Sequence, residues 1–344
     1  NYLKARQKHF KILKRQYTAI IIFKTIVTAG LLIMGGFLVV DRQINLGQFI
    51  AAELIIVLVI SSVEKLISTL EVIYDLLTAL DKVGHVTDLP IEESKGIPLE
   101  SLPNPENFRI DIKNLSYKYE DQKNYSLEGV TLTIKKGEKI CVVGKNNSGK
   151  STFMKILTGL QHEYEGSITY NKFTLRDISI TSYRDMIGEN ISHDEIFEGT
   201  IEENITVGKR GITLEDLQWA MEKVGLLDYV NSLPNGLYTT LIAGGRDLPT
   251  SIRQKIILAR SVAEKPKLLV MDGEFFTEQS DKMLIVDLLM KGNDWALVLV
   301  TNDPVLLTLS DKILFLNEGK MVRVGTYKEM VEDPEFVKLI LNSL

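Results

Sequence analysis

A chain of 344 residues with a formal net charge of -5 is long enough for about two domains. Its acidity argues against a nucleic-acid-binding protein, which normally carries a basic face. Its single cysteine, Cys141, excludes a disulfide within the chain, and the apolar run around it favours a buried structural thiol over a reactive one. The charge is unevenly spread, because residues 1–16 hold six Lys/Arg and no acid.

The first predicted element is an apolar stretch from Thr18 to Val40, long enough to cross a bilayer. One cation, Lys24, lies near its basic end and could extend toward lipid headgroups. After the short polar gap Asp41–Gln48, a second apolar stretch runs from Phe49 to Leu70 and is interrupted by Glu53. The alternative to membrane spans is that these stretches form long amphipathic helices buried in a soluble protein. We predict a membrane hairpin whose basic start places the N-terminus in the cytoplasm.

Three segments follow from the changes in pattern. Residues 1–87 are predicted to form the all-α membrane segment, with a helical pattern continuing to about Val86. Residues 88–107, rich in proline and acids and poor in periodicity, are predicted to be a linker. Strands and helices alternate from Phe108 onward, which indicates an α/β domain over residues 108–344.

The start of this domain alternates apolar and polar residues over 109–120 and again over 125–143. We therefore expect an antiparallel β subdomain that leads into an apolar strand ending at Val143. This strand is followed by G-K-N-N-S-G-K-S, which fits G-x-x-x-x-G-K-[ST] at every fixed position, and then by a helical pattern. The alternative is a chance glycine turn between a core strand and a helix. Such a turn would not need the strand, every motif position and the helix to occur together, so we favour a phosphate-binding loop.

The loop has the residue types that phosphate binding needs. Its backbone N–H groups can curl around a phosphate, with Gly144 and Gly149 allowing the necessary dihedral angles and the next helix contributing its positive end. Lys150 would reach the β- and γ-phosphates, and Ser151 would offer its hydroxyl to Mg²⁺. The predicted nucleotide-binding residues of the loop are Gly144, Lys145, Asn146, Asn147, Ser148, Gly149, Lys150, Ser151 and Thr152. We therefore predict that the chain binds a nucleoside triphosphate, or that it descends from a protein that did.

The remaining elements complete an α/β pattern. Lys265–Asp272 and Trp295–Asn302 are typical of buried strands. A late hairpin is predicted to turn at Glu318–Gly319, and the tail from Tyr327 is predicted to be helical.

Two apolar spans, a linker and a phosphate-loop domain together resemble the C-terminal part of an exporter-type ABC transporter half, over nearly the whole chain. The phrases most similar to half-transporters that export peptides and proteins, including the type 1 secretion group, are INLGQFIAAE, YDLLTALDKV, FEGTIEENI, LPNGLYTT and LARSVAEKPKLLVMD. The resemblance implies a P-loop NTPase cassette with an antiparallel β subdomain and a helical subdomain. It also implies ATP and Mg²⁺ as cofactors, and a cassette on the cytoplasmic side of the inner or plasma membrane.

Such halves carry six spans, of which only the last two are present here. We therefore expect a fragment, a truncated reading frame or one piece of a split transporter. The cargo cannot be predicted, because the family's substrate contacts come mostly from the other spans.

The resemblance places two further site residues. Tyr119 falls where the family stacks an aromatic ring on adenine, although a strand residue packing on a neighbour is the alternative. Asp272 ends an apolar strand, as the family's second Mg²⁺-organising carboxylate does, and a carboxylate at that place is costly without a role. Ser151 and Asp272 are therefore the predicted metal ligands.

The positions concerned with hydrolysis depart from the family pattern. Gly273 stands where the family has the glutamate that polarises the attacking water, and Glu274, one residue on, would point to the opposite face of an extended segment. Asn302 stands in place of the histidine that contacts the γ-phosphate, and it cannot become positively charged. Ser192 stands in place of the glutamine that links Mg²⁺ and water to the membrane domain.

Further departures affect the segments that contact a partner subunit. The signature L-S-G-G-Q falls on LPTSI, Leu248–Ile252, where Pro249 lacks an N–H group. Gln279 replaces an aspartate and Ala243 a glutamate. Six changes beside an intact phosphate loop predict a pseudo-ATPase, which binds ATP but has impaired turnover, and no catalytic residue is predicted to be intact.

Two functions remain open at this point. The chain is either an ATP-binding subunit or fragment of a peptide or protein exporter, as a homo- or heterodimer with another ABC half-transporter, or a nucleotide-binding membrane module that regulates and does not transport. A decaying gene product is a third alternative. In each membrane-bound case we expect contact with lipid and none with nucleic acid.

Overall fold

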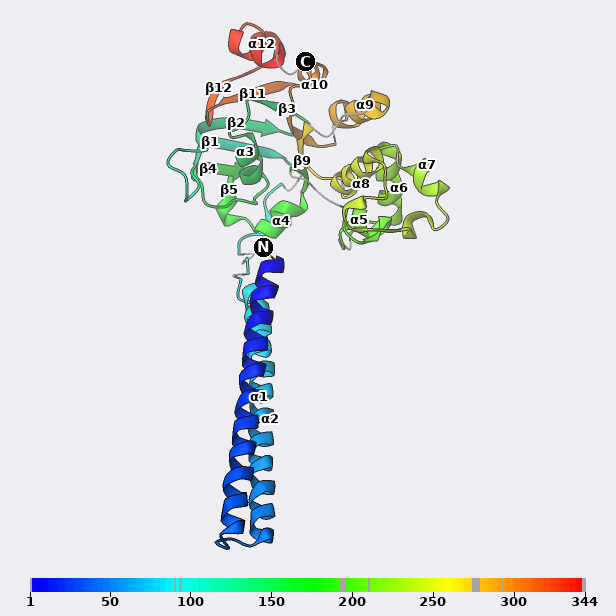
Figure 1. Cartoon of the computed structure of the whole chain (residues 1–344). Coiled ribbons are helices and arrows are strands. Elements are labelled where there is room, and N and C mark those ends of the chain that lie inside the picture. Colours follow the sequence, from blue (N-terminus) through cyan, green and yellow to red (C-terminus); the bar gives the residue numbers. More distant parts are fainter. Residues whose placement is uncertain are drawn as a thin grey trace. The chain divides into compact units, whose positions relative to one another are not determined.

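The computed structural model describes residues 2–89, 91–92, 95–104, 106–191, 196–209, 211–273, 279–292 and 294–341. The chain divides into two compact units, Asn1–Glu92 and Glu93–Leu344 (Figure 1). Each unit is described by itself.

The first unit is a hairpin of two long helices, α1 (Tyr2–Val40) and α2 (Leu46–Thr87), which lie side by side (Figure 1). A capping box begins α2: the Asn45 side chain accepts from the Gln48 backbone at 2.8 Å, and the Gln48 side chain accepts from the Asn45 backbone at 3.0 Å. Gly35 permits close packing, because the Phe49 ring lies where a Cβ at this position would be.

Both helices are long and apolar enough to cross a membrane, judged by length and composition, over Arg6–Val40 and Leu46–Leu66. Almost none of the residues in these windows is buried. The basic segment that precedes the first apolar stretch is part of α1, so the helix begins well before Thr18.

The predicted linker is only partly free of structure. Residues 95–104 belong to the second unit and pack within it: Ile97 pairs with Ile178 in a parallel bridge, and Leu99 and Leu102 are buried. The Leu99 backbone donates to Ser182 Oγ at 2.6 Å. Proline and charge are therefore poor indicators of where the second unit begins.

The second unit is built on a ten-stranded mixed sheet with the order β5-β4-β1-β2-β12-β11-β3-β10-β9-β6. Its strands are β1 (Arg109–Tyr117), β2 (Leu127–Lys135), β3 (Lys139–Val143), β4 (Glu165–Tyr170), β5 (Phe173–Thr174), β6 (Ile187–Asn190), β9 (Leu268–Asp272), β10 (Ala296–Val300), β11 (Lys312–Asn317) and β12 (Lys320–Gly325). A separate two-stranded sheet joins β7 (Gly199–Thr200) and β8 (Thr240–Leu241).

Strands β11, β3, β10, β9 and β6 pair parallel with one another in that order, whereas β5, β4, β1 and β2 pair antiparallel with one another. The predicted antiparallel subdomain is therefore confirmed as one side of a continuous sheet. The late hairpin is confirmed too, since β11 and β12 pair antiparallel around Glu318 and Gly319, whose φ angles are 49° and 79°.

The described helices of this unit are α3 (Lys150–Leu157), α4 (Ile180–Asp185), α5 (Ile201–Thr206), α6 (Leu214–Lys223), α7 (Leu227–Ser232), α8 (Thr250–Val262), α9 (Gln279–Val286), α10 (Pro304–Leu309), α11 (Tyr327–Met330) and α12 (Pro334–Leu341). Helices α5 to α8 gather into a helical group beside the sheet (Figure 1).

Strand β3 lies between the two apolar cores of this unit. Cys141 and Val143 pack in the core that contains α8 and α12, whereas Ile140 and Val142 pack in the core that contains α3. Alternate residues of an extended strand point to opposite faces, so an unbroken apolar run fits a strand buried on both sides. The phosphate loop thus begins from one of the most deeply buried strands of the sheet.

Candidate functional site

The glycine loop connects β3 to α3 through a tight turn that needs its two motif glycines. Gly149 has φ +96°, and a Cβ there would collide with the backbone carbonyl oxygen of Ser126. A Cβ at Gly144 would collide with Ser148 Oγ and with the carbonyl oxygen of Leu316. Both glycines are therefore required by close approach, and Gly149 is required by its dihedral angle as well.

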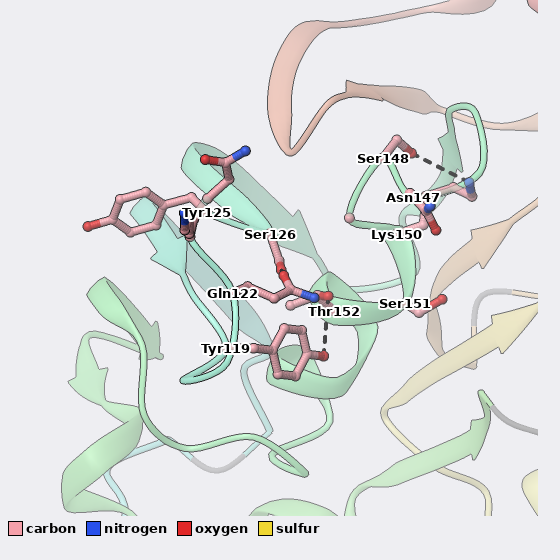
Figure 2. Close-up of a pocket in the computed structure, with 12 residues that line it drawn as sticks. Tyr119, Gln122, Tyr125, Ser126, Asn147, Ser148, Lys150, Ser151 and Thr152 are labelled. Atoms are coloured by element: carbon pink, nitrogen blue, oxygen red, sulfur yellow. Dashed lines mark hydrogen bonds between the residues drawn. The ribbon is translucent and has the colours of Figure 1, made fainter.

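Lys150 lies at the centre of this turn. Its Nζ donates to the backbone carbonyls of Gly144 at 2.8 Å and Lys145 at 2.7 Å, and it lies 3.5 Å from Ser148 Oγ (Figure 2). Lys150 is also the first residue of α3, so its ammonium group and the positive end of the helix act on the same volume. Such a combination favours an anion.

A cavity of about 560 Å³ opens in front of the loop. Its walls are formed by Tyr119, residues 122–126 and residues 147–152 (Figure 2). The structure thus brings seven of the predicted cofactor-binding residues into one cavity: Tyr119, Asn147, Ser148, Gly149, Lys150, Ser151 and Thr152. Gly144, Lys145 and Asn146 belong to the same loop and do not line this cavity.

Tyr119 is half-buried, packs on a neighbouring ring and lines the cavity. Its hydroxyl lies 3.4 Å from Thr152 Oγ1, and its ring meets that of Tyr117 edge-on at 4.8 Å (Figure 2). The ring therefore packs on a neighbour and also faces the cavity.

Residues 122–126 were not predicted as part of the site. They lie in the connection from β1 to β2, and Ser126 Oγ donates to Gln122 Oε1 at 2.9 Å. Tyr125 donates to Glu165, and its ring points away from the loop (Figure 2). The only signal for this segment was its position shortly after Tyr119, because no motif marks it.

Asp272 ends β9 at the same edge of the sheet as the phosphate loop. In the parallel register Asp272 lies opposite Val300 of β10, and Val300 lies opposite Val142 of β3. Asp272 is partly buried and has an interaction partner. No group of three or more His, Cys, Asp or Glu side chains that could hold a metal occurs among the described residues. One carboxylate and one hydroxyl nevertheless suit Mg²⁺, which usually takes its other ligands from phosphate and water.

Gly273 follows β9 in a crowded position. A Cβ there would lie 2.5 Å from the carbonyl oxygen of Val300 and 2.9 Å from Thr301 Cβ. The neighbours are backbone and a β-branched residue, which cannot turn aside as a flexible side chain can. A longer side chain would therefore require the ends of β9 and β10 to separate.

The other predicted departures lie at different places. Asn302 follows β10 and is partly buried. Pro249 is the exposed N-cap residue of α8 and makes no side-chain cap hydrogen bond, whereas Ala243 begins a short exposed 3₁₀ turn. Ser192 and Glu274 lie outside the described residues, as does the side chain of Gln279.

Two buried groups of β3 titrate abnormally. Burial raises the pKa of the Cys141 thiol to about 12, so the thiol stays protonated, and the expectation of an inert buried thiol is confirmed. Burial lowers the pKa of Lys139 to about 8, against the attraction of Asp311 and Asp294. The Lys139 ammonium donates to the backbone carbonyl of Trp295 at 2.8 Å, which ties the start of β3 to the residue before β10.

Residues 127–275 match the family model described as ABC transporter. The matched segment runs from β2 to just past Asp272, and so includes the phosphate loop, the helical group and Gly273. The chain carries an ABC transporter domain. Such a domain implies ATP binding, in agreement with the cavity in front of the loop.

Three curated proteins similar to this chain are named as ATP-binding proteins with permease, translocation or transport roles. A probable ABC transporter ATP-binding/permease protein of Haemophilus influenzae is 29% identical over 277 residues, which is 80% of this chain and 50% of that protein. The alpha-hemolysin translocation ATP-binding protein HlyB of Escherichia coli O6:H1 is 25% identical over 88% of this chain and 43% of HlyB. The pediocin PA-1 transport/processing ATP-binding protein PedD of Pediococcus acidilactici is 27% identical over 93% of this chain and 44% of PedD. The resemblance to exporter-type ABC halves is confirmed, and the chain spans half the length or less of these relatives.

A solved structure supports the same fold. A bacterial Atm1-family ABC exporter, determined with ATP bound, superposes with a TM-score of 0.69 at 20% identity. The superposition covers 78% of this chain and 47% of the exporter chain.

Proposed function

We propose that the chain is an ATP-binding component of an ABC-type membrane exporter of peptides or proteins, and that it binds Mg-ATP but hydrolyses it little or not at all. One observation carries the proposal: an intact phosphate loop forms the wall of a cavity, while the nearby end of β9 has neither the family's glutamate nor room for one.

Binding would use the residues around the cavity. Backbone N–H groups of residues 145–151 would surround the β-phosphate, and Lys150 would contact the β- and γ-phosphates. Tyr119, at the side of the cavity away from the glycine loop, would stack on the adenine ring. Thr152 Oγ1, at 3.4 Å from the Tyr119 hydroxyl, connects the loop side of the cavity to the side where the adenine ring would lie.

Mg²⁺ would be held by Ser151 and Asp272. Ser151 is exposed at the start of α3, and Asp272 reaches the same edge of the sheet from β9. When bound, the cation would neutralise charge on the phosphates. Two protein ligands are enough for this role, because the remaining positions belong to phosphate oxygens and water.

Hydrolysis would be impaired at two described positions. Gly273 has no group that could accept a proton from water, and Asn302 cannot supply positive charge to the γ-phosphate. Each loss of this kind typically costs about 10²- to 10⁴-fold in rate. Together they make turnover negligible on the timescale of ordinary ATPases.

The hairpin of α1 and α2 would anchor the protein in the inner or plasma membrane. The length and apolar exposure of both helices support this, and the exposed cations Arg6, Lys8, Lys11, Lys14 and Arg15 at the start of α1 favour a cytoplasmic N-terminus. Because a hairpin returns the chain to the side where it began, the cassette would lie in the cytoplasm. The domain limits 1–87, 88–107 and 108–344 remain our proposal for the boundaries.

ABC exporter halves generally dimerise, and we propose a homodimer or a heterodimer with another half-transporter. In such dimers each nucleotide site pairs one phosphate loop with the partner's signature, here Leu248–Ile252. Pro249 offers no N–H at the start of α8, so this signature would contact phosphate poorly. Cycling would then depend on an intact partner.

The test is Mg-ATP binding by the detergent-solubilised 344-residue chain, measured by calorimetry. Lys150→Ala should remove binding, because the loop ammonium group that lines the cavity is lost. Lys155→Ala, which removes an exposed lysine of the same helix, should bind like the unmodified chain. Equal binding by Lys150→Ala and the unmodified chain would contradict the proposed site.

A further inference from the structure

The two helices of the first unit form a cleft that the proposed function does not use. The cleft has a volume of about 500 Å³ and is lined by five residues of α1 between positions 19 and 27 and five residues of α2 between positions 56 and 64. Its walls are apolar, with Phe23 and Ile60 among them, except for Lys24 and Glu64. A cleft of this size lies within the range of roughly 300–1,000 Å³ that small-molecule sites occupy.

Lys24 and Glu64 form the polar part of this cleft. Lys24 Nζ lies 3.1 and 3.3 Å from the two carboxylate oxygens of Glu64. The side chains stay 49% and 37% exposed, so each charge keeps a side that a further partner can reach. The cleft therefore presents one cation and one anion together, above an apolar groove.

The position of the pair along the helices indicates what surrounds it, and here the inference rests on the proposed membrane hairpin. Lys24 and Val40 are sixteen positions apart, and Leu46 and Glu64 are eighteen positions apart. At about 1.5 Å per residue these lengths are roughly 24 and 27 Å, close to the ~30 Å of a hydrocarbon core. The pair would lie at the boundary between hydrocarbon and headgroups on the N-terminal side.

We propose that this cleft binds one zwitterionic phospholipid with a primary ammonium group, such as phosphatidylethanolamine. Its phosphate would contact Lys24 and its ammonium would contact Glu64, while an acyl chain lies between Phe23 and Ile60. Charge complementarity selects this occupant: an anionic lipid would meet the Glu64 carboxylate, and a choline headgroup has no N–H to donate to it.

The experiment is native mass spectrometry of the full chain, solubilised with equal amounts of phosphatidylethanolamine, phosphatidylcholine and phosphatidylglycerol. We expect one retained lipid, predominantly phosphatidylethanolamine. Glu64→Gln should lower its retention about tenfold and Lys24→Met by a similar factor, because each removes a hydrogen bond to a charged group. Glu64→Gln should also increase retention of phosphatidylglycerol, since Lys24 then stands alone.

Two controls keep the result interpretable. The exchanged variant Lys24→Glu/Glu64→Lys keeps one cation and one anion in the cleft and should retain the preference for phosphatidylethanolamine. Lys14→Met removes an exposed cation of α1 outside the cleft and should leave the lipid ratio unchanged.

Equal retention of the three lipids, or equal ratios in the unmodified chain and Glu64→Gln, would overturn the lipid site. A dimer mass without bound lipid would overturn it as well, because a second copy would then cover the cleft. Carbonate extraction of membranes separates this failure from that of the proposed hairpin: a chain that stays in the membrane without lipid preference contradicts only the site, whereas a released chain contradicts the hairpin itself.

Discussion

The loop after β3 and the turn after β9 lie at one edge of the same sheet with only β10 between them, and each contains a glycine in tight contact. Gly149 lets the backbone curl so that its N–H groups can face an anion. Gly273 lets the end of β9 pack tightly against Val300, the last residue of β10, and against Thr301, which follows it. Phosphate binding and water activation are thus specified by different strands, so the residues for one can persist while those for the other change.

The largest effect is expected for Gly149→Ala, which tests the role of the loop after β3 in phosphate binding. The new Cβ would collide with the Ser126 carbonyl in a backbone with φ +96°. We expect ATP affinity to fall at least about 100-fold, because several charged hydrogen bonds to phosphate are misplaced together. Calorimetry is the measurement.

The matched control is Gly208→Ala, whose φ is +72° but whose Cβ would meet nothing within 4 Å. It carries the backbone strain without the collision and should bind ATP normally. Unchanged binding by Gly149→Ala would show that the loop tolerates a side chain there.

Lys139, at the opposite end of β3 from the loop, gives a pH-dependent prediction. Its pKa is about 8 in the folded chain and about 10.4 when unfolded, so between these values the unfolded state binds more protons. The free energy of unfolding should therefore rise with pH across this window, by up to about 3 kcal/mol. Below pH 8 the folded chain bears the full free-energy cost of burying the charged Lys139 ammonium group.

Urea unfolding of the unmodified chain and Lys139→Met at several pH values isolates this group. The variant should be the more stable of the two at pH 7, and its advantage should shrink as the pH rises. A difference that stays constant from pH 7 to pH 10 would mean that burial does not perturb Lys139.

Gly273→Ala and Gly273→Glu test the turn after β9, where the family's glutamate is missing. A Cβ 2.5 Å from the Val300 carbonyl should lower the free energy of unfolding by roughly 1–3 kcal/mol, as overpacking does. Gly273→Glu should therefore fail to create ATPase activity. Gly211→Ala, with open space around its Cβ, is the control and should leave stability nearly unchanged. Rapid hydrolysis by Gly273→Glu would mean that the turn can open.

The smallest effect concerns Asn190, which ends β6 beside β9. The side chain is 1% exposed, and neither amide atom has a hydrogen-bond partner among the described residues. Asn190→Leu should raise the free energy of unfolding by about 1 kcal/mol. Asn204→Leu is the contrasting control, because that buried amide makes three hydrogen bonds with Phe197 and Thr200 and its loss should destabilise. Destabilisation by Asn190→Leu would indicate an unrecognised partner.

Local pattern was sufficient for much of the fold. The run before Gly144 is apolar because β3 is buried on both faces, and the Glu318–Gly319 turn is recognisable because two positive φ angles suit a tight hairpin. The two long apolar helices were likewise expected from composition alone. In each case the physical cause acts between residues that are close in sequence.

Features that depend on distant contacts were not predictable. Leu99 and Leu102 lie in a proline-rich segment, and only the folded surface around Ile178 and Ser182 accounts for their burial. Residues 122–126 border the cavity because β2 returns beside the phosphate loop, which no motif in the segment announces. The crowding at Gly273 likewise arises from β10, far along the chain.

The most direct test of retained binding without turnover is the identity of the bound nucleotide. The full chain would be loaded with Mg-ATP, freed of unbound nucleotide and held for several hours before its ligand is extracted and separated by chromatography. We predict intact ATP, with Lys150→Ala carrying none. ADP recovered from the unmodified chain, together with released phosphate, would contradict the account, because another group would then be activating water.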